Sequence, residues 1–429
     1  MKKRTFAILL FITAFCLKAF IAVYYNAPQT SDFGLIYDAA LKLSHGDLSI
    51  LKTNYFELWS YQTGIVSYYA LLLKLGCNIM ALKLINCLFI AGVNVLIYMI
   101  SDRLAGEKCS RFISVLYLIY PATFFLCSVL TNQHISNFFI LLGVYLFIYK
   151  ERKNLISIIP AAVSIAVGNA FRPQGVVIIT ALLIYLIMEL ISGRPFQKFK
   201  KNQLLIISAF LIVYLLLGKG FSLAARLTGV NENGLENNFP LYKFVIGLNY
   251  KTSGCYSLED VVNLVYIKDK KVRDEKSLKT IEERLSDGRK VRELMVNKFE
   301  RMWVRMDGSI DWGFKINESK VNILGKVASY QDFKNRVQKL EKVFYCFVYV
   351  LAAAGILAEI RRKECIKGFI PIILIISANF AVYCVIEIQP RYRDFQMIFI
   401  FLLAAVGLEY FTKLMITNWK STKNFIGRI

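Results

Sequence analysis

The sequence predicts an all-α polytopic membrane protein with about ten transmembrane helices. Of the 429 residues, 56% are hydrophobic, and apolar segments of near-spanning length recur along the chain, each ending in charged or turn residues. A helix needs roughly 20 apolar residues to cross about 30 Å of hydrocarbon. The predicted spans are 6–25, 79–101, 112–130, 134–149, 155–171, 175–191, 203–219, 343–360, 368–386 and 395–412.

The first apolar segment has features of a secretory signal, because three basic residues at 2–4 precede it. Its apolar run, 6–25, is too long for the hydrophobic part of a signal peptide. The sequence that follows, Ala27-Pro28-Gln29, is also a poor cleavage site. We therefore expect this segment to be retained as the first span.

The basic residues predict the orientation of the chain. A net charge of +23 would indicate a nucleic-acid partner in a soluble protein, but here Lys and Arg cluster in short gaps between the spans. The basic clusters lie at 2–4, 103–111, 150–153, 194–201, 361–367 and 413–428. If the ten spans alternate, all of them fall on one side, which the positive-inside rule identifies as the cytoplasm. We expect a multi-pass protein of the cell membrane with both termini in the cytoplasm and no nucleic-acid partner.

This topology divides the chain into three parts. Residues 1–219 form an N-terminal transmembrane module with a first outer loop at 26–78, residues 220–342 form a partly helical extracytoplasmic loop, and residues 343–429 form the last transmembrane helices and a cytoplasmic tail. Within the first outer loop, 61–75 is short and apolar, and counting it as a span would move the basic cluster after it outside. We expect a helix in the outer membrane interface there.

The long outer loop contains a charged stretch, 270–305, dense in Lys, Arg and Glu with apolar residues at helical spacing. Such a pattern is typical of a solvated helix face. At this size the loop can form a small helical cap, but hardly an independent catalytic domain.

The cysteines and histidines do not indicate a metal site or a disulfide framework. The nine cysteines are scattered without metal-ligand spacing, and the chain has two histidines. Cys77 and Cys255 are the only plausible outward pair, and we expect no disulfide. The sequence also has no P-loop, no Gly-rich dinucleotide motif and no nucleophile elbow. We expect no metal and no cofactor.

The first outer loop contains an acidic residue in an unusual position. Asp32 lies just after the first span, in Ser31-Asp32-Phe33, and begins a predicted amphipathic helix at 33–43 that would lie flat against the membrane. One interpretation is that Ser31 or Asp32 is a helix N-cap, a position these residue types favour. The other is that Asp32 is a reaction centre at the membrane surface.

Arg172 lies in Phe171-Arg172-Pro173, between two apolar segments with hardly any loop to hold it. Its side chain either reaches to the membrane interface, as long basic side chains do, or faces a phosphate.

The turn between the last two spans offers a second cationic site. Arg391 and Arg393 flank Tyr392, with Glu387 and Asp394 on either side. These charges either form a local ion-pair network or leave an arginine to bind a lipid phosphate, whose oxygens match the guanidinium fork.

Together these elements resemble the polyprenol-dependent glycosyltransferases of the GT-C fold. The similarity rests on Ser-Asp-Phe with its amphipathic helix after the first span, the interfacial helix, Pro121 after an aromatic run, Phe171-Arg172-Pro173 and Gln389-Pro390-Arg391-Tyr392. It covers most of 1–219 and 343–412 and is similar to the bacterial family 39-like members. These are relatives of protein O-mannosyltransferases and of the lipid A aminoarabinose transferase, with Gram-positive wall glycosyltransferases among the nearest.

The resemblance implies a hexosyltransferase with an external active site and a sugar donor carried on a prenyl phosphate or diphosphate. It makes Asp32 the catalytic residue, a general base for an inverting displacement. Many relatives have paired acids there, and a single carboxylate is a poor divalent-cation site. The implied partners are the polyprenyl-phosphate-linked donor, membrane lipid and an extracytoplasmic acceptor, which is a cell-wall glycopolymer, a lipid or a protein. The implied substrate-binding residues are Arg172, Lys243, Arg391, Tyr392 and Arg393.

Two other functions remain alternatives. A transporter or flippase of lipid-linked sugar precursors would show ionisable residues near the middle of the bilayer and inverted repeats. Here Lys18 and Glu189 lie near span ends, and no repeat is visible. A polysaccharide polymerase or ligase would share the donor class but need a larger outer loop, for which 220–342 is the candidate.

Overall fold

A computed structural model of the chain describes residues 1–149, 154–191, 200–305, 307–314, 320–323, 325–362, 366 and 368–426. The basic clusters predicted at 150–153, at 194–199 and at 363–365 and 367 lie outside these residues, as does the end of the last cluster at 427–429. The protein is an all-α polytopic membrane protein, as predicted. In the described part of the chain the β structure is one short antiparallel hairpin, β1 Lys320–Ile323 with β2 Lys326–Ser329.

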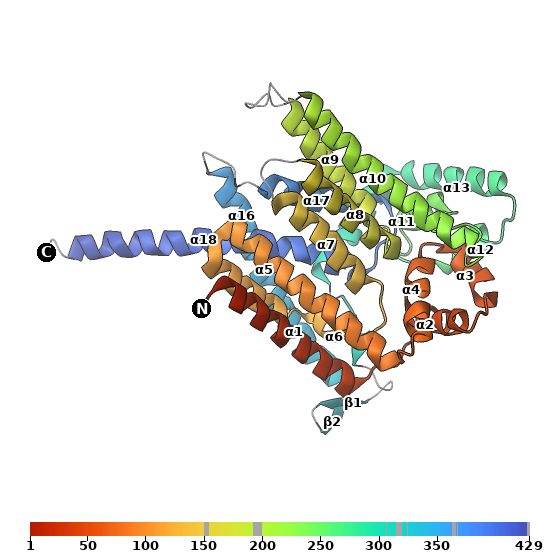
Figure 1. Cartoon of the computed structure of the whole chain (residues 1–429), viewed down its shortest axis with the longest axis horizontal. Helices are drawn as coiled ribbons and strands as arrows, with labels where there is room; N and C mark the ends of the chain where they lie inside the picture. The colour runs from red at the N-terminus through yellow and green to blue at the C-terminus, as the bar shows by residue number, and fades with distance from the viewer. Residues whose placement is uncertain are drawn as a thin grey trace.

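Nine apolar helices form the membrane bundle (Figure 1). Five of those described are long and apolar enough to cross a membrane, and α7, α8, α9 and α17 have 17 residues each. Seventeen residues rise about 25 Å, close to the minimum that a bilayer requires. The nine are α1 Lys3–Tyr25, α5 Ile79–Leu118, α7 Gln133–Tyr149, α8 Leu155–Phe171, α9 Gly175–Ile191, α10 Lys200–Leu227, α16 Tyr330–Ile360, α17 Phe369–Val385 and α18 Arg393–Ile426.

Helix α5 is broken at Gly106. This residue has φ 77°, a left-handed conformation that glycine adopts without steric cost. The chain turns back there, since the Cys87 thiol lies 3.7 Å from the Cys127 carbonyl oxygen, although the two residues are 40 apart in sequence. The number of passes, predicted as about ten, stays a prediction.

The predicted third span, 112–130, is not one helix. Helix α5 ends at Leu118 and a short helix, α6 Pro121–Leu126, follows after a turn. Proline disfavours helical backbone in the residue before it, here Tyr120, but is well suited to the first turn of a new helix. Pro121 therefore separates the two helices within an otherwise continuous apolar run.

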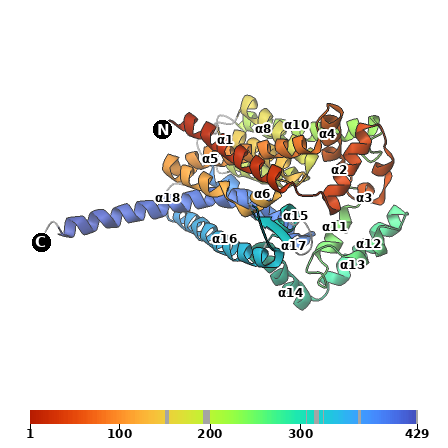
Figure 2. The same ribbon diagram turned by 90° about the horizontal axis from the view of Figure 1, so that it is seen from below.

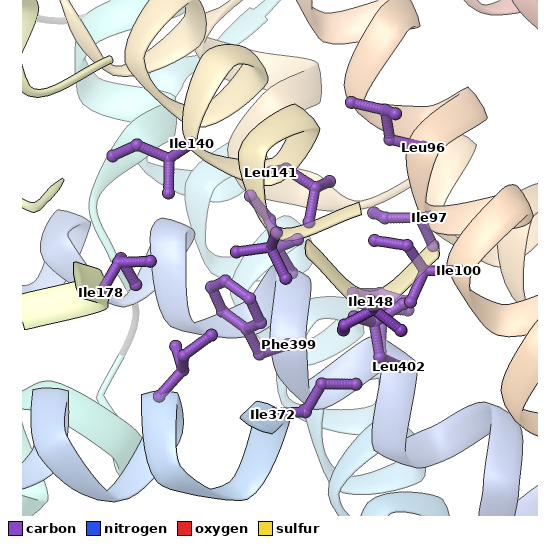
Figure 3. Packing of buried hydrophobic residues seen from close by; sticks show 14 of the residues in the cluster. Leu96, Ile97, Ile100, Ile140, Leu141, Ile148, Ile178, Ile372, Phe399 and Leu402 are labelled. Carbon is purple, nitrogen blue, oxygen red and sulfur yellow. The ribbon is translucent and has the colours of Figure 1, made fainter. Parts of the chain in front are cut away.

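The core of the bundle lies among α5, α7, α8, α9, α10, α16, α17 and α18. Figure 3 shows part of it, with Leu96, Ile97 and Ile100 from α5, Ile140, Leu141 and Ile148 from α7, Ile178 from α9, Ile372 from α17, and Phe399 and Leu402 from α18. Close approach of α16 and α18 depends on small residues. A Cβ on Gly407 would lie 1.8 Å from the Leu351 carbonyl oxygen. Glycine thus allows the two backbones to touch, as is common between membrane helices.

The first outer loop is helical and forms its own small core. It contains α2 Ser31–Ser44, the 3-10 turn η1 Ser49–Lys52, α3 Asn54–Leu58 and α4 Gln62–Lys74, the last coinciding with the helix predicted at 61–75. The expectation that the apolar face of α2 lies flat on the membrane is wrong. Ile36 and Ala40 of α2 are buried with Ile65 and Tyr69 of α4, because α4 supplies the apolar surface that this face needs.

The segment between α10 and α16 forms a helical cap. Its elements are α11 Pro240–Gly247, α12 Leu258–Leu264, α13 Lys270–Leu285, α14 Gly288–Phe299, the π-helical turn η3 Glu300–Val304 and α15 Ser309–Gly313. Helices α13 and α14 confirm the helical pattern at 270–305. Lys298 of α14 donates hydrogen bonds to the carbonyls of Gly247, Cys384 and Ile386 at 2.8–2.9 Å, which ties the cap to the end of α17.

The two termini lie at the same end of the molecule, and the outer-loop helices lie at the opposite end (Figure 1). Figure 2 shows α12, α13 and α14 at the edge of the molecule, away from both termini. This arrangement agrees with the predicted alternation of the spans. The assignment of the terminal end to the cytoplasm stays a prediction.

Candidate functional site

A cavity of about 980 Å³ lies where the first outer loop meets the cap and the short turns between spans. Its walls come from α2, α3, residues 131–133, the start of α9, the segment 235–266 and the turn 383–392. Five of the six residues predicted for the site line this cavity. They are Asp32, Arg172, Lys243, Arg391 and Tyr392.

Asp32 is not a helix cap. It is the second residue of α2, and the residue at the N-cap position, Thr30, makes no side-chain capping bond. The Asp32 Oδ2 atom accepts a hydrogen bond of 3.0 Å from Arg391 Nη2, while Oδ1 accepts none from the described residues. Ser31 before it has φ 53°, an uncommon left-handed conformation for a residue with a Cβ. The carboxylate thus points into the cavity with one oxygen free.

The entry to α2 is fixed by hydrogen bonds to the segment after α6. The Gln29 amide donates to the carbonyls of Ala27 and Ser128 at 2.9 and 3.1 Å, and its oxygen accepts from the Leu130 N–H at 2.7 Å. The buried Lys83 ammonium also donates to the Ala27 carbonyl at 2.8 Å. Asp32 is therefore presented by a short, firmly held connection rather than by a free loop.

Arg391 holds Asp32 from the other side of the cavity. Its guanidinium lies over the Phe33 ring at 5.1 Å, and its backbone carbonyl accepts a hydrogen bond of 3.2 Å from Gln133 Nε2. The side chain is only 13% exposed, and the two paired residues are 359 positions apart in the chain. The local ion-pair network is therefore wrong for Arg391, since its partner is Asp32.

Lys243 forms a second ion pair in the cavity, with Glu387. The two residues are also joined by a backbone hydrogen bond of 2.9 Å from the Glu387 N–H to the Lys243 carbonyl, and the ammonium lies 3.8 Å from the centre of the Trp59 ring. Burial by itself lowers the pKa of Lys243, but the neighbouring Glu387 carboxylate more than offsets this and the pKa lies above its ordinary value. Lys243 is therefore a permanent cation at neutral pH.

Arg172 is the cation of the cavity whose charge is not paired. It follows the last residue of α8, donates to Asn132 Oδ1 at 3.4 Å and lies over the Tyr392 ring at 4.8 Å. Tyr392 in turn stacks on Tyr383, with ring centres 6.2 Å apart. Among the described residues, no carboxylate lies within salt-bridge distance of Arg172, so its guanidinium remains available to an anion.

Arg393 does not line the cavity. Its side chain is fully buried, lies 4.0 Å from the centre of the Tyr345 ring, and donates to the carbonyls of Trp303 and Arg305 at 3.1 and 3.0 Å. These contacts join α18 to η3 and α16. Arg393 is therefore not part of the cavity lining, and its burial speaks against the predicted substrate-binding role.

Two residues of the site were missed by sequence reasoning. Asn132 donates to Gln62 Oε1 and to the Phe171 carbonyl at 2.9 and 3.0 Å while it accepts from Arg172, and Gln133 holds the backbone of Arg391. The signal was the polar run Thr-Asn-Gln-His at 131–134 between two apolar segments. Uncharged amides at such a position do not by themselves indicate a site, but Asn132 and Gln133 position Arg172 and Arg391.

The cavity offers no cluster of metal ligands. In the part of the chain that the structure describes, no group of three or more His, Cys, Asp or Glu side chains lies close enough together to hold a metal ion. What the arrangement can do is bind an anion at Arg172 and accept a proton at Asp32.

Two solved structures resemble this chain in fold. One is the archaeal oligosaccharyltransferase AglB from Archaeoglobus fulgidus in complex with an inhibitory peptide and a dolichol-phosphate, with a TM-score of 0.52 and 11% sequence identity. The other is an Archaeoglobus fulgidus oligosaccharyltransferase in the apo form, with a TM-score of 0.55 and 12% identity. Each match covers 99% of this chain and 52% of the other, so the chain spans about half the length of these proteins.

No protein-family model and no curated protein sequence matches the chain. At 11–12% identity the structural likeness shows the fold alone, and it confirms the predicted GT-C-like architecture. Membership of family 39 and a bacterial source stay predictions.

Proposed function

We propose that this protein is an integral-membrane glycosyltransferase that transfers a sugar from a polyprenyl-phosphate donor to an extracytoplasmic acceptor. The observation that carries the proposal is the cavity itself, which brings the Asp32 carboxylate together with three cations from distant parts of the chain. The fold supports the same conclusion. The similar AglB structure contains an inhibitory peptide and a dolichol-phosphate, which is a lipid-linked phosphate.

The charge of the cavity suits a phosphodiester. Three cations, Arg172, Lys243 and Arg391, and two carboxylates, Asp32 and Glu387, line it, which leaves one net positive charge. A sugar linked to a prenyl chain through one phosphate carries one negative charge. Since Arg391 and Lys243 already have carboxylate partners, Arg172 is the residue that binds this phosphate.

The lipid chain of the donor enters along α9. Val176, in the first turn of the apolar helix α9, lines the cavity and is 52% exposed. It is four positions from Arg172 in the sequence. A prenyl chain in the bilayer thus has a direct path to α9 while its phosphate contacts the arginine.

Transfer then follows from the geometry. The free Oδ1 of Asp32 accepts the proton of the acceptor hydroxyl as its oxygen attacks the anomeric carbon. The bond between that carbon and the phosphate oxygen breaks, and the departing phosphate takes the electron pair. Arg172 and Lys243 stabilise the charge that develops on it. Attack from the side opposite the phosphate inverts the anomeric configuration.

Arg391 has a positioning role in this scheme. By holding Oδ2 at 3.0 Å it fixes the plane of the Asp32 carboxylate, so Oδ1 faces the acceptor. A preorganised base of this kind loses little entropy when the acceptor binds.

Reconstituted vesicles test the function. The full chain is placed in proteoliposomes that contain a radiolabelled polyprenyl-phosphate hexose, and transfer to oligosaccharide, peptide and lipid acceptors is measured. We expect Arg172→Ala to raise the donor KM about tenfold, the value of one lost charged contact of about 1.4 kcal/mol. Arg226→Ala is the matched control, because Arg226 is an exposed arginine of α10 outside the cavity.

The alternatives predict different results. Movement of the labelled lipid across the bilayer without any sugar transfer would support a transporter or flippase. Transfer with a donor KM that Arg172→Ala leaves unchanged would contradict the phosphate site.

A further inference from the structure

The rim of the cavity differs from its interior in charge. Nine of the lining residues are also exposed to solvent. Four of them, Asn54, Asn237, Tyr256 and Tyr266, have polar side chains with an amide or a phenol group, and the others are Ser31, Pro173, Val176, Pro240 and Phe244. The two tyrosines are 52% and 65% exposed. All nine exposed lining residues are neutral, whereas the charged lining residues are the two ion pairs and Arg172.

The two tyrosines are held by a rigid helix. Tyr256 precedes α12 and Tyr266 follows it. The buried Asp260 of α12 accepts hydrogen bonds from Asn249 at 2.8 Å and from Arg284 Nη2 at 2.7 Å. This network fixes the inner face of α12 to the cap, so the tyrosines at its two ends stay at the rim with their rings in solvent.

Exposed aromatic rings beside neutral amides suit one class of ligand. A sugar ring has a face of C–H groups that packs on an aromatic ring, while its hydroxyls exchange hydrogen bonds with amide and phenol groups. A charged peptide or an anionic polymer would find no counter-charge on this rim.

We propose that the rim formed by Asn54, Asn237, Tyr256 and Tyr266 is an acceptor subsite for a neutral oligosaccharide. This inference rests on the proposed function and specifies its acceptor class. The terminal sugar of the acceptor reaches Asp32 inside the cavity, and the sugar units behind it pack on Tyr256 and Tyr266. The enzyme thus extends or decorates a glycan.

Binding of defined tetrasaccharides tests the subsite. The full chain in nanodiscs is titrated with maltotetraose, chitotetraose and mannotetraose, and with a Ser/Thr-rich nonapeptide, and saturation-transfer NMR reports binding. We expect at least one tetrasaccharide to bind, and Tyr256→Ala and Tyr266→Ala each to raise its Kd about threefold to tenfold, the value of one lost aromatic contact. The phenylalanine variants at both positions should stay within about twofold of wild type, because they keep the ring.

Tyr250→Ala is the matched control. Tyr250 is an exposed tyrosine of the same cap that does not line the cavity. The inference is overturned if no tetrasaccharide binds, if Tyr250→Ala weakens binding as much as the rim variants, or if the peptide binds in a manner that depends on Tyr256 and Tyr266.

The inference and the proposed function fail in different ways. If a tetrasaccharide binds at the tyrosines but no polyprenyl-phosphate hexose yields transfer to any acceptor, the subsite stands and the function is wrong. If sugar is transferred to the peptide while the tetrasaccharides neither bind nor react, the function stands and the subsite is wrong.

Discussion

Replacement of Asp32 by asparagine separates the chemical role of the carboxylate from its structural role. Asparagine has nearly the same shape, and its carbonyl oxygen can still accept the hydrogen bond from Arg391, but it cannot take a proton from an acceptor. A general base contributes about 10²- to 10⁴-fold in rate. We therefore expect transfer to slow by that factor, equivalent to about 2.7–5.4 kcal/mol of activation free energy.

The expected loss of stability is smaller. Breaking a fully buried ion pair costs about 3–5 kcal/mol, and exposed pairs contribute about 0.2–1 kcal/mol. The Asp32 side chain is 37% exposed and that of Arg391 is 13% exposed, so solvent screens this pair in part. We expect Asp32→Asn to lower the free energy of unfolding by about 1–2 kcal/mol. A change of this size leaves the protein folded and does not account for the rate loss.

The assay measures initial rates of sugar transfer in proteoliposomes, normalised to folded protein by size-exclusion chromatography and thermal unfolding. Asp38→Asn is the control, because Asp38 is an exposed carboxylate of the same helix that does not line the cavity. It should transfer at the wild-type rate. A rate for Asp32→Asn within about threefold of wild type, well below the contribution of a general base, would refute the assignment.

Three further predictions follow from the contacts. Asn132→Ala should raise the donor KM about threefold to tenfold, because it frees Arg172, and should also lower the unfolding temperature, because the Gln62 oxygen and the Phe171 carbonyl lose their donor; steady-state kinetics and thermal scans measure the two effects. Lys243→Met should lower the unfolding temperature by the same amount at pH 6 and pH 9. The folded protein raises the pKa of Lys243, and both pH values lie below the pKa of this lysine in the unfolded chain, so the ion pair stabilises the protein fully at both. A loss that differs between the two pH values in thermal scans would contradict this. Gly407→Ala should lower the free energy of unfolding by about 1–3 kcal/mol, since its Cβ would collide with the Leu351 carbonyl; unfolding in detergent measures this.

The sequence predicted the candidate site better than it predicted the contacts within it. Charged residues at the ends of apolar segments are costly unless they face water, protein or a ligand. This cost predicts a functional role for Asp32, Arg172 and Arg391. The same reasoning predicts a functional role for Arg393, but its side chain is buried outside the cavity. A residue in a helical turn points about 200° away from the residue two positions before it, so neighbouring arginines face opposite sides. Sequence spacing alone did not show where that turn begins.

The positioning residues were not predicted, for a different reason. Asn132 and Gln133 are neutral, and amides occur in many loops, so these residue types do not distinguish a functional site from an ordinary loop. Their importance arises from which groups they meet. Asn132 joins Gln62 of α4 to Phe171 and Arg172 at the end of α8, two elements that lie far apart in the chain.

The sequence by itself determined the class of the protein and the end of the bundle where polar side chains gather. It could do so because lipid offers no hydrogen-bond partners to the backbone, so each long apolar segment must be a helix and each polar gap must lie at a membrane surface. Only the tertiary structure decided that Arg391 meets Asp32, that Lys243 meets Glu387 and that Arg172 keeps its charge free. These pairings depend on how helices far apart in sequence pack against one another, which local spacing does not encode.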